Sequence, residues 1–145
     1  MRELPRLCVL DASVVVKMFV GECESQAVRE TMLQRDADPE SLSLVPDLVF
    51  VECANILWKK VRREGYPEDT ARANLADLKL LALGSTPTRE LIERALEIAC
   101  AHRISAYDAC YVALAEVAGA PLLTADARLA AALADAPCEV LTLGE

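Results

Sequence analysis

Four carboxylates stand beside or within apolar segments, where the presence of a charged side chain has to be explained. They are Asp11 after the run Leu7–Leu10, Glu52 between Val51 and Cys53, Asp108 in "ISAYDACYVALA" and Asp126 directly after "PLLTA". A buried carboxylate without a partner costs several kcal/mol or takes up a proton. Four acids in one pocket therefore need a cation to offset their repulsion, and ligation by oxygen alone favours Mg²⁺ or Mn²⁺.

The other reactive side chains offer little competing chemistry. His102 is the single histidine, so imidazoles cannot build a metal site, and a serine hydrolase triad would need His102 as its base. The six cysteines form no CxxC or other zinc spacing and stand mostly among Val, Ala and Leu, which favours small buried hydrophobes over ligands or disulfides. Catalysis by this chain would therefore rest mainly on carboxylates.

The elements that would position the acids are short apolar strands alternating with helices. Brief unbroken apolar runs are typical of strands covered on both faces, and they occur at Leu7–Leu10, "LSLV", residues 84–86, "PLLT" and "CEVLTL". Helical spacing runs from residue 12 to about 20, from 23 to about 35, from Pro46 to Gly65, from Pro67, and through "TPTRELIERALEIACAHR", "ISAYDACYVALAEVAGA" and "DARLAAALAD". This alternation predicts an α/β fold with a mainly parallel sheet between helices.

In such a sheet ligands bind outside the carboxyl ends of the strands, where Asp11 and Asp126 would lie. Asp108 starts a helix after the short "RIS" segment, and Glu52 shares a helix face with Asn55. We therefore expect the four carboxylates at one edge of the sheet.

Each acid also has a purely structural interpretation. Asp11 and Asp126 could cap the helices that they precede, Asp108 could complete a capping box with Ser105, and Glu52 could pair with Lys59 or Lys60. For a single acid such a role is the more frequent outcome. The combination of four favours a metal site.

The segments that carry these acids resemble PIN domains, and most closely the VapC-type toxins of prokaryotic toxin–antitoxin pairs. The matching segments are "VLDASVVVKMF", "LVFVECANILW", "ISAYDACYVALA" and "PLLTADARL", and the resemblance covers nearly the whole chain. It implies a three-layer α/β/α sandwich and an Mg²⁺- or Mn²⁺-dependent endoribonuclease in which Asp11, Glu52, Asp108 and Asp126 are the matching acids.

The resemblance also implies site roles for hydroxyl and amide side chains. Ser13 and Thr124 match hydroxyl positions near the metal, although Ser13 could equally bond the backbone at the start of its own helix. Asn55 matches as well, but could merely orient Glu52.

Two protein partners are expected. VapC-type relatives are usually dimers neutralised by a cognate antitoxin that lies over the acidic pocket, and the apolar richness of "DLVFVECANILW" and "NLADLKLLAL" independently favours a homodimer.

RNA binding by this chain requires a local basic patch, because the net charge is −8. The candidate contacts are Lys17, Lys59, Lys60 and Arg128, with Arg62 and Arg63 at the same helix end as Lys59. A solvated helix end whose cations complement the helix dipole is an equal interpretation for Arg62 and Arg63.

The chain of 145 residues is expected to form one domain, 1–145, located in the cytoplasm. It has no apolar run long enough to span a membrane, and Arg2, Glu3 and Pro5 argue against a signal peptide.

An aspartyl-phosphate type of phosphatase would need an acid two residues after Asp11, where Ser13 stands. A PIN-like module that binds RNA or a partner without cleavage remains the alternative.

Overall fold

The computed structural model describes residues 3–20 and 26–143 and contains a five-stranded parallel sheet. The strands are β1 (Leu7–Leu10), β2 (Leu42–Pro46), β3 (Leu83–Thr86), β4 (Leu122–Thr124) and β5 (Val140–Thr142), in the order β3-β2-β1-β4-β5. The central strand β1 pairs Val9 with Leu44 on one side and with Leu122 on the other. The predicted parallel α/β sheet is confirmed.

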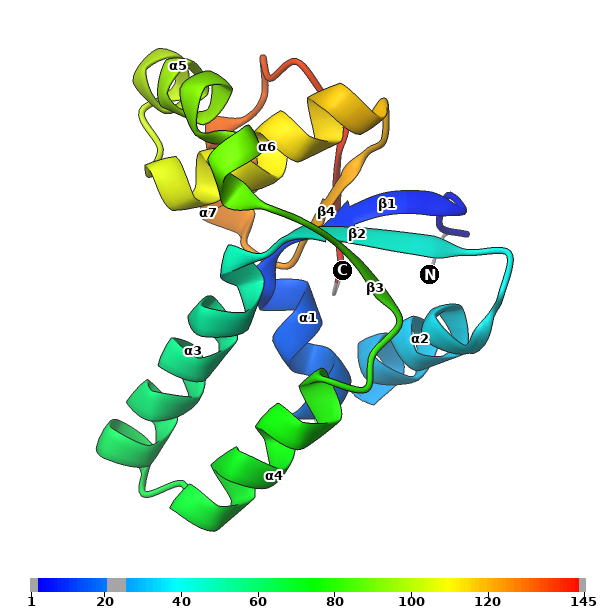
Figure 1. The fold of residues 1–145 in the computed structure, drawn as a ribbon, viewed down its shortest axis with the longest axis vertical. Coiled ribbons are helices and arrows are strands. Elements are labelled where there is room, and N and C mark those ends of the chain that lie inside the picture. Colours follow the sequence, from blue (N-terminus) through cyan, green and yellow to red (C-terminus); the bar gives the residue numbers. More distant parts are fainter. Residues whose placement is uncertain (1–2, 21–25, 144–145) are drawn as a thin grey trace.

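Helices cover both faces of this sheet and complete three layers (Figure 1). One face carries α1 (Ala12–Phe19), α2 (Gln26–Ala37), α3 (Leu48–Glu64) and α4 (Glu68–Leu78), and the other carries α5 (Ile92–His102), α6 (Ala106–Ala118) and α7 (Ala127–Ala132). The strand order explains this division. The chain runs from β1 through β2 to β3, and then crosses back to β4 and continues to β5. Because connections between parallel strands are right-handed, this change of direction places the two groups of helices on opposite faces of the sheet.

Local residue types set most helix ends. Gly65 and Gly119 adopt the left-handed conformation just after α3 and α6, with φ of 67° and 63°, which confirms the predicted stops. The helix expected through "TPTRELIERALEIACAHR" was predicted too long, because the chain first makes a 3₁₀ turn at Thr88–Glu90 after Pro87. The first residues of the helix predicted from residue 23 lie outside the described part of the chain.

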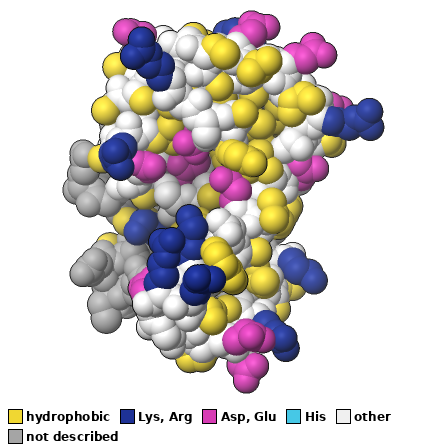
Figure 2. Space-filling model, turned by 90° about the vertical axis from the view of Figure 1, so that its left-hand side faces the viewer, with side chains coloured by type: hydrophobic (Ala, Val, Ile, Leu, Met, Phe, Trp, Pro, Cys, Tyr) yellow, Lys and Arg dark blue, Asp and Glu magenta, His cyan; other side chains and the backbone are white. Residues whose placement is uncertain are grey.

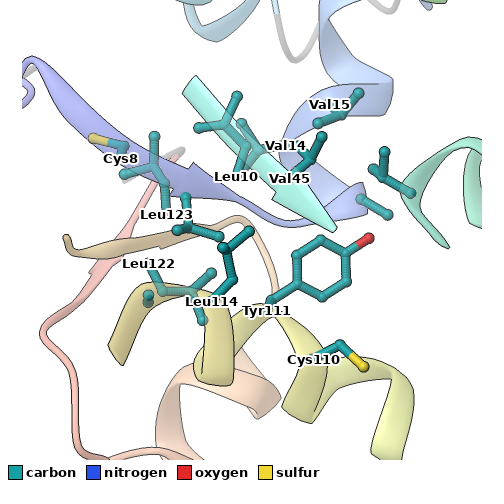
Figure 3. Packing of buried hydrophobic residues seen from close by; sticks show 14 of the residues in the cluster. Cys8, Leu10, Val14, Val15, Val45, Cys110, Tyr111, Leu114, Leu122 and Leu123 are labelled. Carbon is teal, nitrogen blue, oxygen red and sulfur yellow. The ribbon is translucent and has the colours of Figure 1, made fainter. Parts of the chain in front are cut away.

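The core holds β1 in place on both faces (Figure 3). Val14 and Val15 of α1 pack on one side of the strand, and Leu114 and Tyr111 of α6 pack on the other. Residues Cys8, Val9 and Leu10 are fully buried, so the position at which β1 delivers the following residue, Asp11, is fixed by packing.

Among the described cysteines none forms a disulfide, and Cys8, Cys53 and Cys110 are buried. Burial raises the pKa of the Cys53 thiol to about 12, so this group behaves as a small hydrophobe, as predicted. Within residues 3–20 and 26–143 no helix has the length and apolar character needed to cross a bilayer.

Candidate active site

The four predicted acids lie around the carboxyl edge of the sheet. Asp11 follows β1, Asp126 follows β4, Asp108 stands in the first turn of α6, and Glu52 lies on α3. Burial raises the pKa of the Asp11, Glu52 and Asp108 carboxyls and is the largest cause in all three, because it disfavours the charged form. Neighbouring charges add to this effect: Asp108 raises the pKa of Asp11 and Glu52, and Asp126 raises that of Asp108. Asp108 thus lies within electrostatic reach of each of the other three acids.

Asp11 is the most enclosed of these acids, with 4% of its surface exposed. Its Oδ1 accepts hydrogen bonds from Ser13 Oγ at 2.5 Å and from the Val14 backbone N–H at 3.2 Å. Its Oδ2 accepts a hydrogen bond from Thr124 Oγ1. These donors oppose the effect of burial on the pKa and fix the direction of the carboxylate.

Ser13 and Thr124 connect Asp11 to the turn after β4. The Ala125 backbone N–H donates to Ser13 Oγ at 2.9 Å, and the Asp126 backbone N–H donates to Thr124 Oγ1 at 3.0 Å. Each hydroxyl thus accepts a hydrogen bond from the turn after β4 and donates one to the Asp11 carboxylate. The alternative for Ser13, a bond to its own helix backbone, is not the arrangement found.

The capping interpretation is correct for both strand-end aspartates, and it is compatible with a site role. Asp11 is the N-cap of α1 through Val14, and Asp126 Oδ1 accepts from the Arg128 and Leu129 backbone N–H groups at 3.0 and 3.1 Å. The Asp108 backbone N–H donates to Ser105 Oγ at 3.1 Å, which is half of the predicted capping box. Capping holds the aspartate side chains in place but uses only part of the capacity of their carboxylates to accept hydrogen bonds.

Tyr111 is a site residue that the sequence reasoning missed. Its hydroxyl donates to Glu52 Oε1 at 2.6 Å, while the side chain is 1% exposed. The ring reaches from α6 across the ends of the strands (Figure 3). Burial raises the Glu52 pKa and the Tyr111 hydrogen bond lowers it, so the phenol supports the carboxylate in its charged form. The available signal was that Tyr111 lies one helical turn after Asp108, on the same side of α6.

A groove of about 520 Å³ extends from Glu52 between α3 and the start of α6. It is lined by Val51, Glu52, Asn55, Ile56, Lys59 and Tyr107. Figure 2 shows acidic side chains across the middle of one face of the molecule, Lys and Arg side chains below them and hydrophobic side chains beside both. Asn55 and Lys59 are thus placed next to a predicted site acid.

The remaining basic residues predicted to contact RNA are dispersed. Lys60 lies 4.0 Å from Glu64 on α3, and the Arg62 guanidinium lies 5.5 Å from the Trp58 ring centroid. Arg128 is exposed on the first turn of α7, beside Asp126. Lys17 is half-buried in the last turn of α1, at the opposite end of that helix from Asp11. Of the predicted cations, only Lys59 lines the groove.

The chemistry of the donor set fits a hard divalent cation, because every candidate ligand is an oxygen and three of the acids are mutually destabilised in their charged forms. In the present side-chain positions, however, no three Asp, Glu, His or Cys side chains of the described residues lie close enough together to hold one ion. Asp11 and Glu52 instead face protein donors.

The comparisons with known proteins agree on one family. The profile of the PIN domain matches residues 8–134. Ribonuclease VapC1 of Mycobacterium tuberculosis H37Rv is 38% identical over 134 residues, which span 92% of this chain and 95% of the relative. Among solved structures, PAE2754 from Pyrobaculum aerophilum has a TM-score of 0.67 at 23% identity, with 92% of this chain and 82% of that chain covered. VapBC2 from Rickettsia felis, bound to a DNA fragment from its promoter, has a TM-score of 0.66 at 13% identity, covering 94% and 98%.

Proposed function

Because this chain belongs to the PIN domain family, with a VapC ribonuclease 38% identical along nearly its full length, we propose that it is an Mg²⁺- or Mn²⁺-dependent endoribonuclease. We further propose that it is the toxin of a type II toxin–antitoxin pair. The single observation that carries the catalytic proposal is the buried Asp11 carboxylate, which is aimed by Ser13 and Thr124 and lies within electrostatic reach of Asp108 and Glu52.

In this proposal the side chains divide into ligands and positioning residues. A divalent ion bound by these residues would lower the pKa of a water and offset negative charge on the phosphate. Asp11 and Asp108 would hold the ion, and Asp126 or Glu52 would act through water or accept a proton. Ser13 and Thr124 keep the Asp11 carboxylate in one orientation, and Tyr111 does the same for Glu52.

RNA, a cognate antitoxin and a second copy of the chain are the proposed partners. Lys59 in the groove and the exposed Arg128 are the basic side chains best placed for phosphates. The proposed homodimer has support in large apolar side chains left on the surface: Ile92 and Leu96 are one turn apart on α5, with 55% and 62% of their surface exposed.

Cleavage of a mixed RNA pool tests the catalytic proposal. The wild-type protein should cut RNA with Mg²⁺ or Mn²⁺ and stop when a chelator is added. Asp11→Asn should abolish cutting, whereas Asp69→Asn, which changes an exposed acid in the first turn of α4, should leave it intact. Undiminished cleavage by Asp11→Asn would refute the role of this carboxylate. Failure of the wild type with every divalent metal would instead favour a module that binds without cutting.

A further inference from the structure

A polar side chain lies in the middle of the face that α4 buries. The buried residues of α4 are Ala71, Asn74 and Leu78, which share one side of the helix by three- and four-residue spacing. Asn74 is only 8% exposed, so its amide has lost most of its contact with water and needs partners inside the protein. A single buried asparagine can fix the register of packed helices at a cost in stability, and an apolar residue at this position could not.

Both ends of the Asn74 amide are used, and they join three parts of the chain. Its Nδ2 donates to the Phe19 carbonyl at 3.0 Å, at the carboxyl end of α1. Its Oδ1 accepts a hydrogen bond of 2.5 Å from the hydroxyl of Tyr66, which lies in the turn between α3 and α4. Arg29 of α2 donates from Nε to the neighbouring Met18 carbonyl at 3.3 Å. Carbonyls in the last turn of a helix have no partner within it, so side chains of two other helices hold the end of α1.

The carboxylates Asp11 and Glu52 lie at the other ends of the helices that this network joins. Asp11 precedes α1, and Glu52 lies in the second turn of α3, where the charge of Asp11 raises its pKa. The sheet fixes where α3 begins, because only Asp47 separates it from β2. Its direction depends on what holds the rest of the helix. There α3 and α4 extend away from the sheet as a pair, and both contact α1 (Figure 1).

We propose that Asn74 and Tyr66 are positioning residues, which hold the α3–α4 pair in one register on α1 and thereby fix Glu52 relative to Asp11. The inference rests on the metal-dependent function proposed above and adds two residues that set the geometry of its site from a distance. Neither residue is a ligand in this proposal. Loss of either hydrogen bond should therefore change the affinity for a divalent ion as well as the stability of the fold.

Two variants break the network to different degrees. Asn74→Leu removes both hydrogen bonds, and Tyr66→Phe keeps the ring and removes one. Isothermal titration calorimetry of the folded proteins should show Mn²⁺ binding weakened by about 2- to 30-fold, the range for mutations in a network that couples distant sites, with the larger loss in Asn74→Leu. In ¹H–¹⁵N spectra of the metal-free proteins, the amide shifts should change at Asp11 and Glu52 as well as near the substitution.

Leu91→Ala is the matched control. Leu91 is 5% exposed and lies between the start of α5 and the second half of α6, on the other face of the sheet from α1, α3 and α4. Its truncation should lower the melting temperature and leave the Mn²⁺ affinity and the amide shifts of Asp11 and Glu52 as in the wild type. A merely structural role for Asn74 would make its variants behave as this control does.

Three results would overturn the positioning role. They are an Mn²⁺ affinity unchanged in both variants, an equal loss of affinity in Leu91→Ala, or amide shifts that change only in α4, the preceding turn and the end of α1. Each of these leaves the metal-dependent proposal intact, because the wild type still binds Mn²⁺. A wild type that binds no Mn²⁺ would instead refute that proposal, and the amide shifts of Asp11 and Glu52 would then decide the positioning role alone.

Discussion

Thr124→Val should destabilise the metal-free protein although it creates no cavity. The threonine is fully buried, and valine replaces its hydroxyl with a methyl group of nearly the same volume. The change leaves Asp11 Oδ2 without a donor and the Asp126 backbone N–H without an acceptor. A buried polar group that loses its partner costs about 1–3 kcal/mol, and more when it is charged, so we expect a loss of roughly 2–4 kcal/mol.

This loss can be measured by thermal and denaturant unfolding in the presence of a chelator. For a domain of this size it corresponds to a melting temperature lower by roughly 5–15 °C. Thr124→Ser is the control, because it keeps the hydroxyl and removes one methyl group at a cost of about 1 kcal/mol. Mn²⁺ titration by calorimetry should show weaker binding to Thr124→Val than to Thr124→Ser. If the valine variant is as stable as the serine variant, the threonine hydroxyl does not hold Asp11 and the positioning argument is wrong.

Two further predictions follow from the electrostatics of the site. Burial raises the folded-state pKa of Asp11, Glu52 and Asp108 above the ordinary values of 3.8 and 4.5, so the folded protein binds more protons than the unfolded chain between those values and neutrality. Stability of the metal-free protein contributed by these groups should therefore rise as the pH falls from about 8 to about 5. Melting curves in chelator should show this slope, and Asp11→Asn, which keeps a good N-cap, should flatten it; a slope of the opposite sign that the variant leaves unchanged would contradict the assignment. Tyr111→Phe removes the hydroxyl that donates to Glu52 and should weaken Mn²⁺ binding and lower kcat for RNA with KM unchanged, at a stability cost of about 1–2 kcal/mol. Unaltered Mn²⁺ affinity in calorimetry would show that Tyr111 is only a core residue.

The fold was predictable because its strands and helix ends have local causes. The unbroken run Leu7–Leu10 marks a strand buried on both faces, and Gly65 and Gly119 mark helix ends that need a left-handed residue. Prediction failed where the local signal was ambiguous. Pro87 is compatible with a helix start, yet the chain makes a 3₁₀ turn before α5. The residue that caps the end of α5 is Arg103, a non-glycine residue with φ of 56°.

The site was predictable only in part, because its acids have local signals and their partners do not. An acid that ends an apolar run is visible in the sequence. The hydroxyl of Thr124 meets a carboxylate 113 residues away, and the phenol of Tyr111 meets one 59 residues away, so these pairs appear only when the chain is folded. Thr124 entered the prediction through family resemblance alone, and Tyr111 was indistinguishable from an ordinary core aromatic.

The placement of the acids also explains how the chain tolerates so much negative charge at one edge before any cation binds. Asp11 and Asp126 are N-caps and Asp108 lies in the first turn of α6, so three of the four carboxylates stand at the positive ends of helix dipoles. Glu52 lies beyond the first turn of α3 and lacks this help, and it is the acid that receives the Tyr111 hydroxyl. The groups that stabilise each carboxylate are thus the same groups that set its direction. Removing one of them should reduce both the stability of the metal-free fold and its affinity for the ion, whereas removing a carboxylate charge should separate the two.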